Sequence, residues 1–316
     1  MSIHLLSTIN AGYEVPFRVT VQSLLNQLEA DTPVSWHVFG TGLTATLREA
    51  IETQAAAHSM RFRWYDFSPD QLTELPVRGR FIPHVYARII APTHLPDNVD
   101  RFLYLDGDIL FLDGISALWK TDLQDKVIAA APDMAVPRAS LPMGIARYRE
   151  LGIAADAPYF NAGVYLVDRA AWERHDTSQR ALDYIKRYGD SINLLDQDAL
   201  NVALHGCWKP LNIRWNLISS LAGRRHYHPD GIDSAEYRRA VTDPGIIHFA
   251  GLLKPWIYPR TASLWTPQYL EILRQVFPLH RFSNTLKVRS YSFYDRWLRW
   301  LLYPVENYVW AKRKGF

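Results

Sequence analysis

The chain has 316 residues, of which 48% are hydrophobic and 21% are charged, and its formal net charge is +3. This is the composition of a globular protein and excludes a disordered or fibrous chain, and the length allows one large domain or two ordinary ones around a substantial core. A net charge this small gives no reason of its own to expect nucleic-acid binding.

The sequence lacks the marks of export and of membrane insertion. Its first residues show neither the basic start nor the long apolar stretch of a secretion signal, so no export is expected. No uninterrupted apolar run approaches the ~20 residues that a membrane-spanning helix needs. The single cysteine, Cys207, cannot form an internal disulfide, which fits a reducing cytosol.

Strands and helices are expected to alternate from the N-terminus. Residues 3–9 read as a short apolar strand, and apolar residues at helical spacing follow between 17 and 28. A strand at 34–39, a helix at 43–58 and a strand at 61–67 come next. This alternation predicts an α/β fold with a mostly parallel sheet covered by helices on both faces.

The same pattern continues through the middle of the chain. A strand at 102–105 ends at Asp106, and an apolar run resumes at 109–112. Further strands are expected at 127–131 and 163–167, and helices at 169–187 and 197–205. Open α/β sheets bind ligands beyond the carboxyl ends of their strands, and the polar clusters of this sequence fall at or near such ends.

The strongest chemical signal is the segment FLYLDGDILF, residues 102–111. Asp106 and Asp108 lie two residues apart in near-extended backbone, so both can point to one side and clamp one cation. Hard oxygen ligands suit magnesium or manganese bridging a diphosphate, and Gly107 lets the backbone approach the phosphates. Asp-Gly is also a hairpin signal, in which case both carboxylates are merely solvated. The motif alone leaves both readings open.

A second cluster is IIHFAGLLKPW, residues 246–256. A nitrogen of His248 could complete the metal site, and an imidazole beside two carboxylates favours manganese over magnesium. Lys254 would neutralise charge on a departing phosphate, and Gly251 would leave room for it. Taken singly, His248 is more often a hydrogen-bonded core histidine, and Lys254 a solvated lysine.

Two further clusters carry polar side chains. Asp196, Gln197 and Asp198 stand at the head of an expected helix, where Asp196 suits a helix cap and Asp198 the positive helix end, so a purely structural role also exists. Asn161, within YFNAG, either hydrogen-bonds sugar hydroxyls or makes a turn. Asp133 likewise either reaches sugars or supports a turn.

Together these motifs resemble glycosyltransferase family 8, and most of all its bacterial lipopolysaccharide and lipooligosaccharide α-galactosyl- and glucosyltransferases. After the opening strand and helix, the resemblance is carried by YAR at 86–88, LDGD at 105–108, FNAG at 160–163, DQD at 196–198 and HFAGLLKPW at 248–256. It spans roughly residues 3–260. The resemblance implies a GT-A fold, which has a Rossmann-like, nucleotide-sugar-binding mixed sheet with helices on both faces. It also implies a UDP-sugar donor, Mn²⁺ with Mg²⁺ as the alternative, and retention of the anomeric configuration.

The resemblance also implies roles for particular residues. Asp106, Asp108 and His248 look like the metal ligands. Contacts to the donor are expected from Arg88, Asp106, Gly107, Asn161, Asp196, Gln197, His248, Gly251 and Lys254, of which Gly251 and Lys254 look like diphosphate contacts. Gln197, Asp196 and Lys254 are the expected catalytic residues.

The position of Gln197 in the family pattern lies beneath the anomeric carbon. An amide is a poor nucleophile, so we expect attack from the face of the leaving group, with the leaving phosphate taking the acceptor proton. Asp196 would orient the sugar hydroxyls, and Asp198 is the less favoured nucleophile.

The first loop departs from the family pattern. Family members commonly carry an aspartate there that recognises uracil, whereas residues 7–10 read STIN and offer no carboxylate. Thr8 and Asn10 can still hydrogen-bond a base. The sequence therefore specifies the type of reaction better than it specifies which nucleotide the donor carries.

The last residues, 281–316, differ in charge from the rest. They carry a net charge of +6, whereas the other 280 residues sum to −3, and ten aromatic residues are interleaved with the basic ones. This suits a helix lying in the headgroup layer of an anionic membrane, and the other reading is an aromatic-rich helix packed on the enzyme. The acidic remainder of the chain disfavours nucleic acid.

We therefore expect a GT-A catalytic domain at 1–280, a basic helical tail at 281–316, and a cytoplasmic protein attached to the inner face of the bacterial cytoplasmic membrane. The expected reaction moves galactose or glucose from a UDP-sugar to a lipopolysaccharide-type or other surface glycan. Two alternatives are a sugar nucleotidyltransferase and a non-catalytic carbohydrate-binding protein on the same fold. A nucleotidyltransferase would be expected to have a glycine-rich phosphate loop near the N-terminus, and the segment INAGY at 9–13 is not one.

Overall fold

The computed structural model describes residues 2–29, 31–67, 83–224, 227–251, 254–259 and 263–280. The predicted tail at 281–316 lies outside these residues. None of the described helices is long and apolar enough to cross a membrane.

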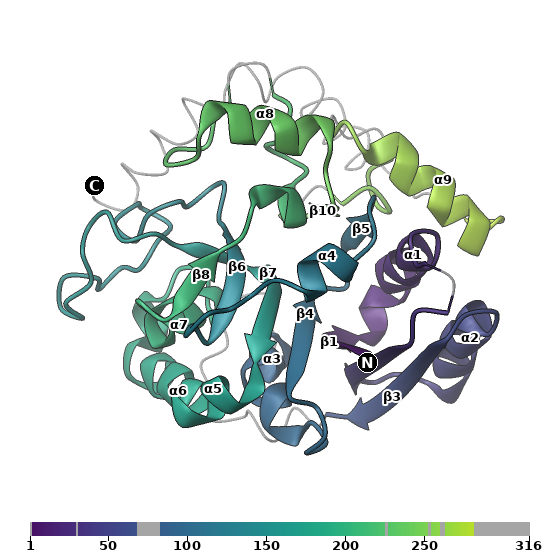
Figure 1. The fold of residues 1–316 in the computed structure, drawn as a ribbon, viewed down its shortest axis with the longest axis horizontal. Coiled ribbons are helices and arrows are strands. Elements are labelled where there is room, and N and C mark those ends of the chain that lie inside the picture. Colours follow the sequence, from purple (N-terminus) through teal and green to yellow (C-terminus); the bar gives the residue numbers. More distant parts are fainter. Residues whose placement is uncertain are drawn as a thin grey trace.

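Seven strands form the main sheet, in the spatial order β3-β2-β1-β4-β7-β6-β8 (Figure 1). They are β1 (Ile3–Asn10), β2 (Val34–Thr41), β3 (Met60–Asp66), β4 (Arg101–Leu105), β6 (Ile128–Pro132), β7 (Phe160–Asp168) and β8 (Trp208–Pro210). Strands β3, β2, β1 and β4 are parallel to one another, and β6 is parallel to β8. The expected α/β fold is therefore present.

The sheet is mixed and mostly parallel, as predicted, and one strand runs against the others. Strand β7 runs antiparallel to both β4 and β6. The reason lies in the connection, because residues 133–159 contain no helix that could carry the chain across the sheet from β6 to a parallel position.

Side chains of each central strand alternate between two cores. Phe102 and Tyr104 of β4 belong to one apolar cluster, and Leu103 and Leu105 to the other. Both faces are apolar because helices cover both, as expected for a strand at the centre of an α/β sheet. The helices on the Tyr104 side are α3 (Ala87–Ile90), α5 (Arg169–Arg174), α6 (Thr177–Tyr188) and α7 (Asp196–Ala203), and those on the Leu105 side are α1 (Glu14–Leu25), α2 (Ala45–Ala55) and α4 (Ser116–Trp119).

The helix predicted at 169–187 is two helices. Asp176 has φ 52°, in the left-handed region, and separates α5 from α6. The helical spacing of apolar residues in the sequence does not reveal this break, because a single residue in the left-handed conformation changes the direction of the helix without changing the composition.

A second, three-stranded sheet has the order β5-β10-β9. Its strands are β5 (Ile109–Phe111), β9 (Leu217–Ile218) and β10 (Ile246–His248), and it packs with α8 (Ser234–Thr242) and α9 (Thr266–Val276), seen at the top of Figure 1. Strand β10 pairs antiparallel with β5, with His248 opposite Ile109. This pairing brings the end of the chain's catalytic region to the turn that follows β4.

Candidate active site

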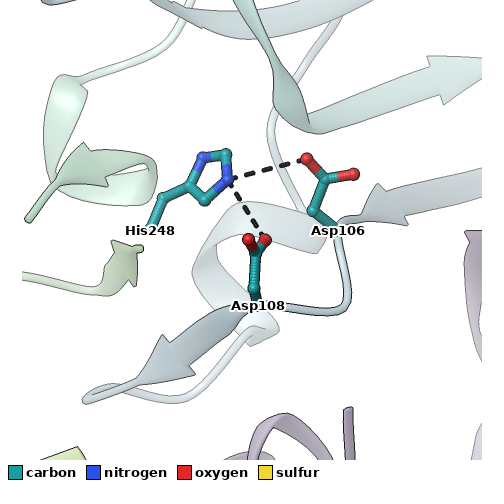
Figure 2. Close-up of side chains that lie close together, drawn as sticks. All are labelled: Asp106, Asp108 and His248. Carbon is teal, nitrogen blue, oxygen red and sulfur yellow. Dashed lines mark ion pairs between the residues drawn. The ribbon is translucent and has the colours of Figure 1, made fainter. Parts of the chain in front are cut away.

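Asp106, Asp108 and His248 meet where the two sheets join (Figure 2). His248 Nε2 lies 3.6 Å from Asp106 Oδ2 and 3.3 Å from Asp108 Oδ1. The three residues each offer a ligand atom within 4.8 Å of the others. Two neighbouring carboxylates and a distant imidazole therefore face one point, as the sequence predicted.

This cluster has the dimensions of a divalent-cation site. Ligand atoms around one octahedral ion with bonds of ~2.1 Å lie roughly 3–4.2 Å apart, which matches the two Nε2–oxygen distances. Two hard oxygens and one imidazole nitrogen form a donor set that suits a first-row divalent metal. The residues present therefore fit a metal ion.

Asp108 is paired with Lys254 on the side away from His248. Lys254 Nζ donates to Asp108 Oδ2, and also to the Phe249 carbonyl oxygen at 2.7 Å. Burial acts against ionisation of Asp108, yet Lys254 and His248 hold its pKa below its usual range. The carboxylate is thus charged at neutral pH and can act as a ligand.

Asp106 is paired with Arg88 in a similar way. Arg88 Nη2 lies 2.8 Å from Asp106 Oδ1, and Arg88 Nε lies 2.8 Å from Asp196 Oδ2. The guanidinium also donates to the Ala162 carbonyl oxygen at 2.7 Å and lies 4.9 Å from the centre of the Tyr104 ring. One partly buried arginine therefore joins three of the predicted motifs, LDGD, FNAG and DQD.

Burial dominates the electrostatics of these carboxylates. It raises the pKa of Asp196 to about 6, although Arg88 opposes this. It also raises the pKa of Asp106 against the attraction of Arg88 and His248. For Arg88, burial alone would lower the pKa, but Asp106 and Asp196 raise it well above its usual value. Arg88 is thus a permanent cation between two partly buried acids.

Gln197 lies beside this group, with both ends of its amide engaged. Its Oε1 accepts a hydrogen bond from the Ala162 N–H at 3.0 Å, and its Nε2 donates to Asp133 Oδ2 at 3.1 Å. Asn161 Nδ2 donates to the same Asp133 oxygen at 2.7 Å. The other oxygen of Asp133 accepts hydrogen bonds from two backbone N–H groups of the following turn. Asp133 therefore supports a turn, which was one of its two expected roles.

Asp198 makes its hydrogen bonds with residues outside the metal cluster. It is fully buried and accepts hydrogen bonds from the Tyr159 hydroxyl and from the backbone N–H groups of Asn193 and Leu194. Burial raises its pKa to about 6, against the effect of the Tyr159 hydrogen bond. These contacts tie the start of α7 to the segment before β7.

The predicted first loop, residues 7–10, is the end of strand β1, and it lies against the turn between β4 and β5. Thr8 Oγ1 lies 2.9 Å from the Tyr104 hydroxyl, which in turn donates to Asp106 Oδ1 at 3.2 Å. Asn10 Oδ1 accepts from the Gly12 N–H at 2.9 Å and caps the 3-10 helix that follows. Of the predicted base-contacting residues, Thr8 is therefore connected to the metal cluster through one hydroxyl.

The structure shows why glycine is needed at two of the predicted site positions, Gly107 and Gly251, and the reasons differ. A Cβ at Gly107 would lie 3.1 Å from Ile9 Cγ2, so glycine lets the β4–β5 turn pack on the end of β1. Gly251 has φ +92°, a conformation that side chains rarely adopt, while the space beside it is open. Gly251 is thus required by the backbone, and nothing in the described residues obstructs the space above it.

Two residues that hold His248 were missed from the sequence. Asn216 is buried, and its Oδ1 lies 3.0 Å from His248 Nδ1. A Cβ at Gly163 would lie 2.3 Å from His248 Cε1, so only glycine leaves room for the ring. Gly163 lies in the recognised FNAG segment, but its sequence gives no sign that an imidazole packs on it, and Asn216 lies in no motif.

The fold and this acidic, metal-compatible site define a nucleotide-sugar-dependent glycosyltransferase of the GT-A type. Residues 4–259 match Glycosyl transferase family 8, and the chain belongs to that family. The predicted family, fold class and enzyme class are confirmed, which sets aside the nucleotidyltransferase and the non-catalytic binding protein.

Similar proteins agree with this assignment. General stress protein A of Bacillus subtilis (strain 168) is 24% identical over 80% of this chain and 87% of its own length. Lipopolysaccharide 1,2-glucosyltransferase of Escherichia coli (strain K12) is 28% identical over 67% of this chain and 61% of its own length. The crystal structure of the galactosyltransferase LgtC with donor and acceptor sugar analogs superposes with a TM-score of 0.74 at 26% identity, covering 91% of this chain and 99% of that chain.

Proposed function

We propose that this glycosyltransferase moves galactose or glucose from a UDP-sugar to a lipopolysaccharide-type or other surface glycan, with Mn²⁺ and with retention at the anomeric carbon. The observation that carries the proposal is the convergence of Asp106, Asp108 and His248 beside Lys254 and the Arg88–Asp196 pair. Relatives named for lipopolysaccharide glucosyl and galactosyl transfer support the acceptor class and both sugars.

The three clustered side chains would hold the metal. When bound, the metal supplies Lewis acidity that stabilises negative charge on the diphosphate leaving group. Mn²⁺ is preferred over Mg²⁺ because one ligand is an imidazole, and Mg²⁺ takes oxygen ligands almost exclusively. Lys254 stands at the same carboxylate and would donate to a phosphate oxygen as the charge develops.

Retention follows best from attack on the face of the leaving group. The bond from the anomeric carbon to the β-phosphate oxygen breaks, the bond to the acceptor oxygen forms on the same face, and the acceptor proton passes to the phosphate. A covalent alternative needs a carboxylate below the sugar. The nearby candidates are engaged elsewhere: Asp198 is buried, Asp196 forms an ion pair with Arg88, and the Gln197 side-chain oxygen accepts a hydrogen bond from a backbone N–H group. These contacts favour attack without a covalent intermediate.

Contacts to the rest of the donor are assigned by position in the site. Arg88, Asp196, Asn161 and Gln197 would line the sugar, and Gly251 would admit the diphosphate. Thr8 and Asn10 would contact the base, where both offer neutral hydrogen-bonding groups in place of a carboxylate.

Attachment to the membrane is a separate part of the proposal. A lipid-linked acceptor would lie at the inner face of the cytoplasmic membrane, where the basic, aromatic residues 281–316 would contact anionic headgroups. Removing residues 286–316 is expected to abolish sedimentation with anionic liposomes and to spare activity on a small soluble acceptor. Unchanged sedimentation would contradict this part.

The test of the reaction is a donor screen. The protein is incubated with Mn²⁺ and UDP-galactose, UDP-glucose or UDP-N-acetylglucosamine, with and without a glycan acceptor, and UDP and product are measured by mass spectrometry. We expect UDP release from one hexose donor and an α-linked product by NMR. A β-linked product would contradict retention, and release from UDP-N-acetylglucosamine alone would contradict hexose transfer.

A further inference from the structure

Two residues outside the proposed ligand set, Gly163 and Asn216, hold the imidazole of His248 in place. Gly163 lies under one edge of the ring, where any Cβ would collide with Cε1 and Nδ1. Asn216 meets the ring at Nδ1, and both Asn216 and His248 are buried. A buried ring nitrogen needs a defined hydrogen-bond partner, so the identity of the Asn216 atom facing it decides where the proton lies.

A chain of hydrogen bonds starting at Asp133 determines that atom. A carboxylate can only accept, so Asn161 must turn its NH₂ group to Asp133, at 2.7 Å, and its oxygen the other way. That oxygen accepts from Asn216 Nδ2 at 2.9 Å and from the Gly163 N–H at 2.9 Å. Asn216 must then present its own oxygen to His248.

The reverse orientation fails at each link. An Asn216 turned by 180° would place its oxygen against the Asn161 oxygen, and two acceptors would face each other in a buried site. Asn161 cannot turn to relieve this, because its oxygen is also fixed by the Gly163 N–H. Leaving such buried groups unsatisfied costs about 1–3 kcal/mol for each group, so the chain has one stable direction.

We propose that Asp133 and Asn216 are positioning residues that hold His248 with a proton on Nδ1 and so reserve Nε2, the nitrogen that faces Asp106 and Asp108, for the metal. The assignment deepens the proposed function, on which its metal-binding part rests. With the proton on Nε2 instead, an N–H would point at both carboxylates and occupy the place of a cation. Fixing the tautomer of a ligating histidine through its second nitrogen is a general way to tune a metal site.

The same carboxylate also reaches the sugar side of the site. Asp133 Oδ2 accepts from Gln197 Nε2 as well as from Asn161 Nδ2. One buried oxygen therefore orients both the proposed metal ligand, through two amides, and the amide expected beneath the anomeric carbon.

The test measures the tautomer directly in metal-free protein. Long-range ¹H–¹⁵N NMR correlations of histidine-labelled protein distinguish protonated Nδ1 from protonated Nε2, and His248→Gln assigns the signal. We expect protonated Nδ1 in the wild type. Asn216→Leu removes the acceptor and is expected to lose this tautomer and to weaken Mn²⁺ binding by about 10–100-fold, measured by electron paramagnetic resonance. Asn216→Asp keeps an acceptor toward His248 but places its second oxygen against Asn161 Oδ1, so it is expected to retain the proton on Nδ1 and to lower the thermal midpoint.

A matched control is Asn193→Ala. The Asn193 amide donates to the Pro142 and Gly144 carbonyl oxygens, away from His248, so its loss is expected to lower the thermal midpoint and leave the tautomer and the Mn²⁺ affinity unchanged. An unprotonated Nδ1 in the wild type, or a folded Asn216→Leu protein with the wild-type protonation of Nδ1 and the wild-type affinity, would overturn the proposal. Wild-type protein with protonated Nδ1 and no Mn²⁺ binding would support the hydrogen-bond chain and contradict the proposed metal-dependent function.

Discussion

Arg88 Nη2 lies 2.8 Å from Asp106 Oδ1, while the other oxygen of Asp106 faces His248. Asp108 divides its oxygens in the same manner, with Oδ2 on Lys254 and Oδ1 facing His248. In each carboxylate, one oxygen thus pairs with a cationic side chain and the other faces His248. Both cations favour the ionised acid: Lys254 holds the pKa of Asp108 low, whereas Arg88 only opposes the rise that burial causes in the pKa of Asp106. The remaining oxygens are left for a metal.

Removal of Arg88 should destabilise the protein. Arg88→Met leaves Asp106 and Asp196 buried without their shared partner, and the unfolding free energy should fall by about 3–5 kcal/mol. Arg88→Lys keeps a charge but not the planar fork, so it should recover only part of the loss. Urea unfolding measures this. The control Arg147→Met breaks an exposed pair with Glu150 and should cost about 1 kcal/mol or less. Equal losses at both arginines would contradict the bridging role.

Asp198 should make stability depend on pH between about 4 and 6. Its pKa is raised from 3.8 to about 6 in the folded protein, so the folded state binds the proton more tightly than the unfolded state. Its contribution to stability is complete below the unfolded pKa and is lost as the pH rises through the folded one. A shift of this size corresponds to at most about 3 kcal/mol. Asp198→Asn should flatten this part of the curve in denaturant titrations, and parallel wild-type and variant curves would refute the assignment.

A side chain at Gly163 should displace His248. Gly163→Ala places a methyl group within 2.3 Å of Cε1, so the ring must move from the carboxylates. Turnover should fall by about 10² or more, as for the loss of one electrostatic contact to a transition state. Gly152→Ala is the control, since it strains the backbone at φ +69° with no neighbour within 4 Å, and should reduce stability alone. Normal turnover in Gly163→Ala would contradict the role of His248.

Lys254 should affect turnover more than metal affinity. Lys254→Met removes the cation that would stabilise the leaving phosphate, and kcat should fall by about 10² or more. The variant leaves all three proposed ligands in place, so Mn²⁺ binding should not weaken. Lys209→Met, which only loses a hydrogen bond to the Asp122 carbonyl oxygen, should behave as wild type in both assays. A loss confined to metal affinity would place Lys254 in a purely structural role.

The sequence predicted the alternating elements and the metal cluster because both leave local patterns. An apolar strand ending in Asp-Gly-Asp and a histidine within HFAG are visible without a structure, and family resemblance joined them. The direction of β7 was not predictable, because an apolar strand buried on both faces shows the same pattern whichever way it runs. The link from Asn216 to His248 depends on the register of β9 against β10, in which Ile218 lies opposite His248, and no short motif encodes that pairing.

The central claim is that one divalent cation is bound jointly by Asp106, Asp108 and His248. Its most direct test is Mn²⁺ titration by electron paramagnetic resonance, with UDP present, in the wild type and in Asp106→Asn, Asp108→Asn and His248→Gln. We predict one ion per wild-type chain and an affinity at least about 10-fold weaker in every variant, since each removes or weakens one ligand. Wild-type affinity in any of these three folded variants would contradict the claim.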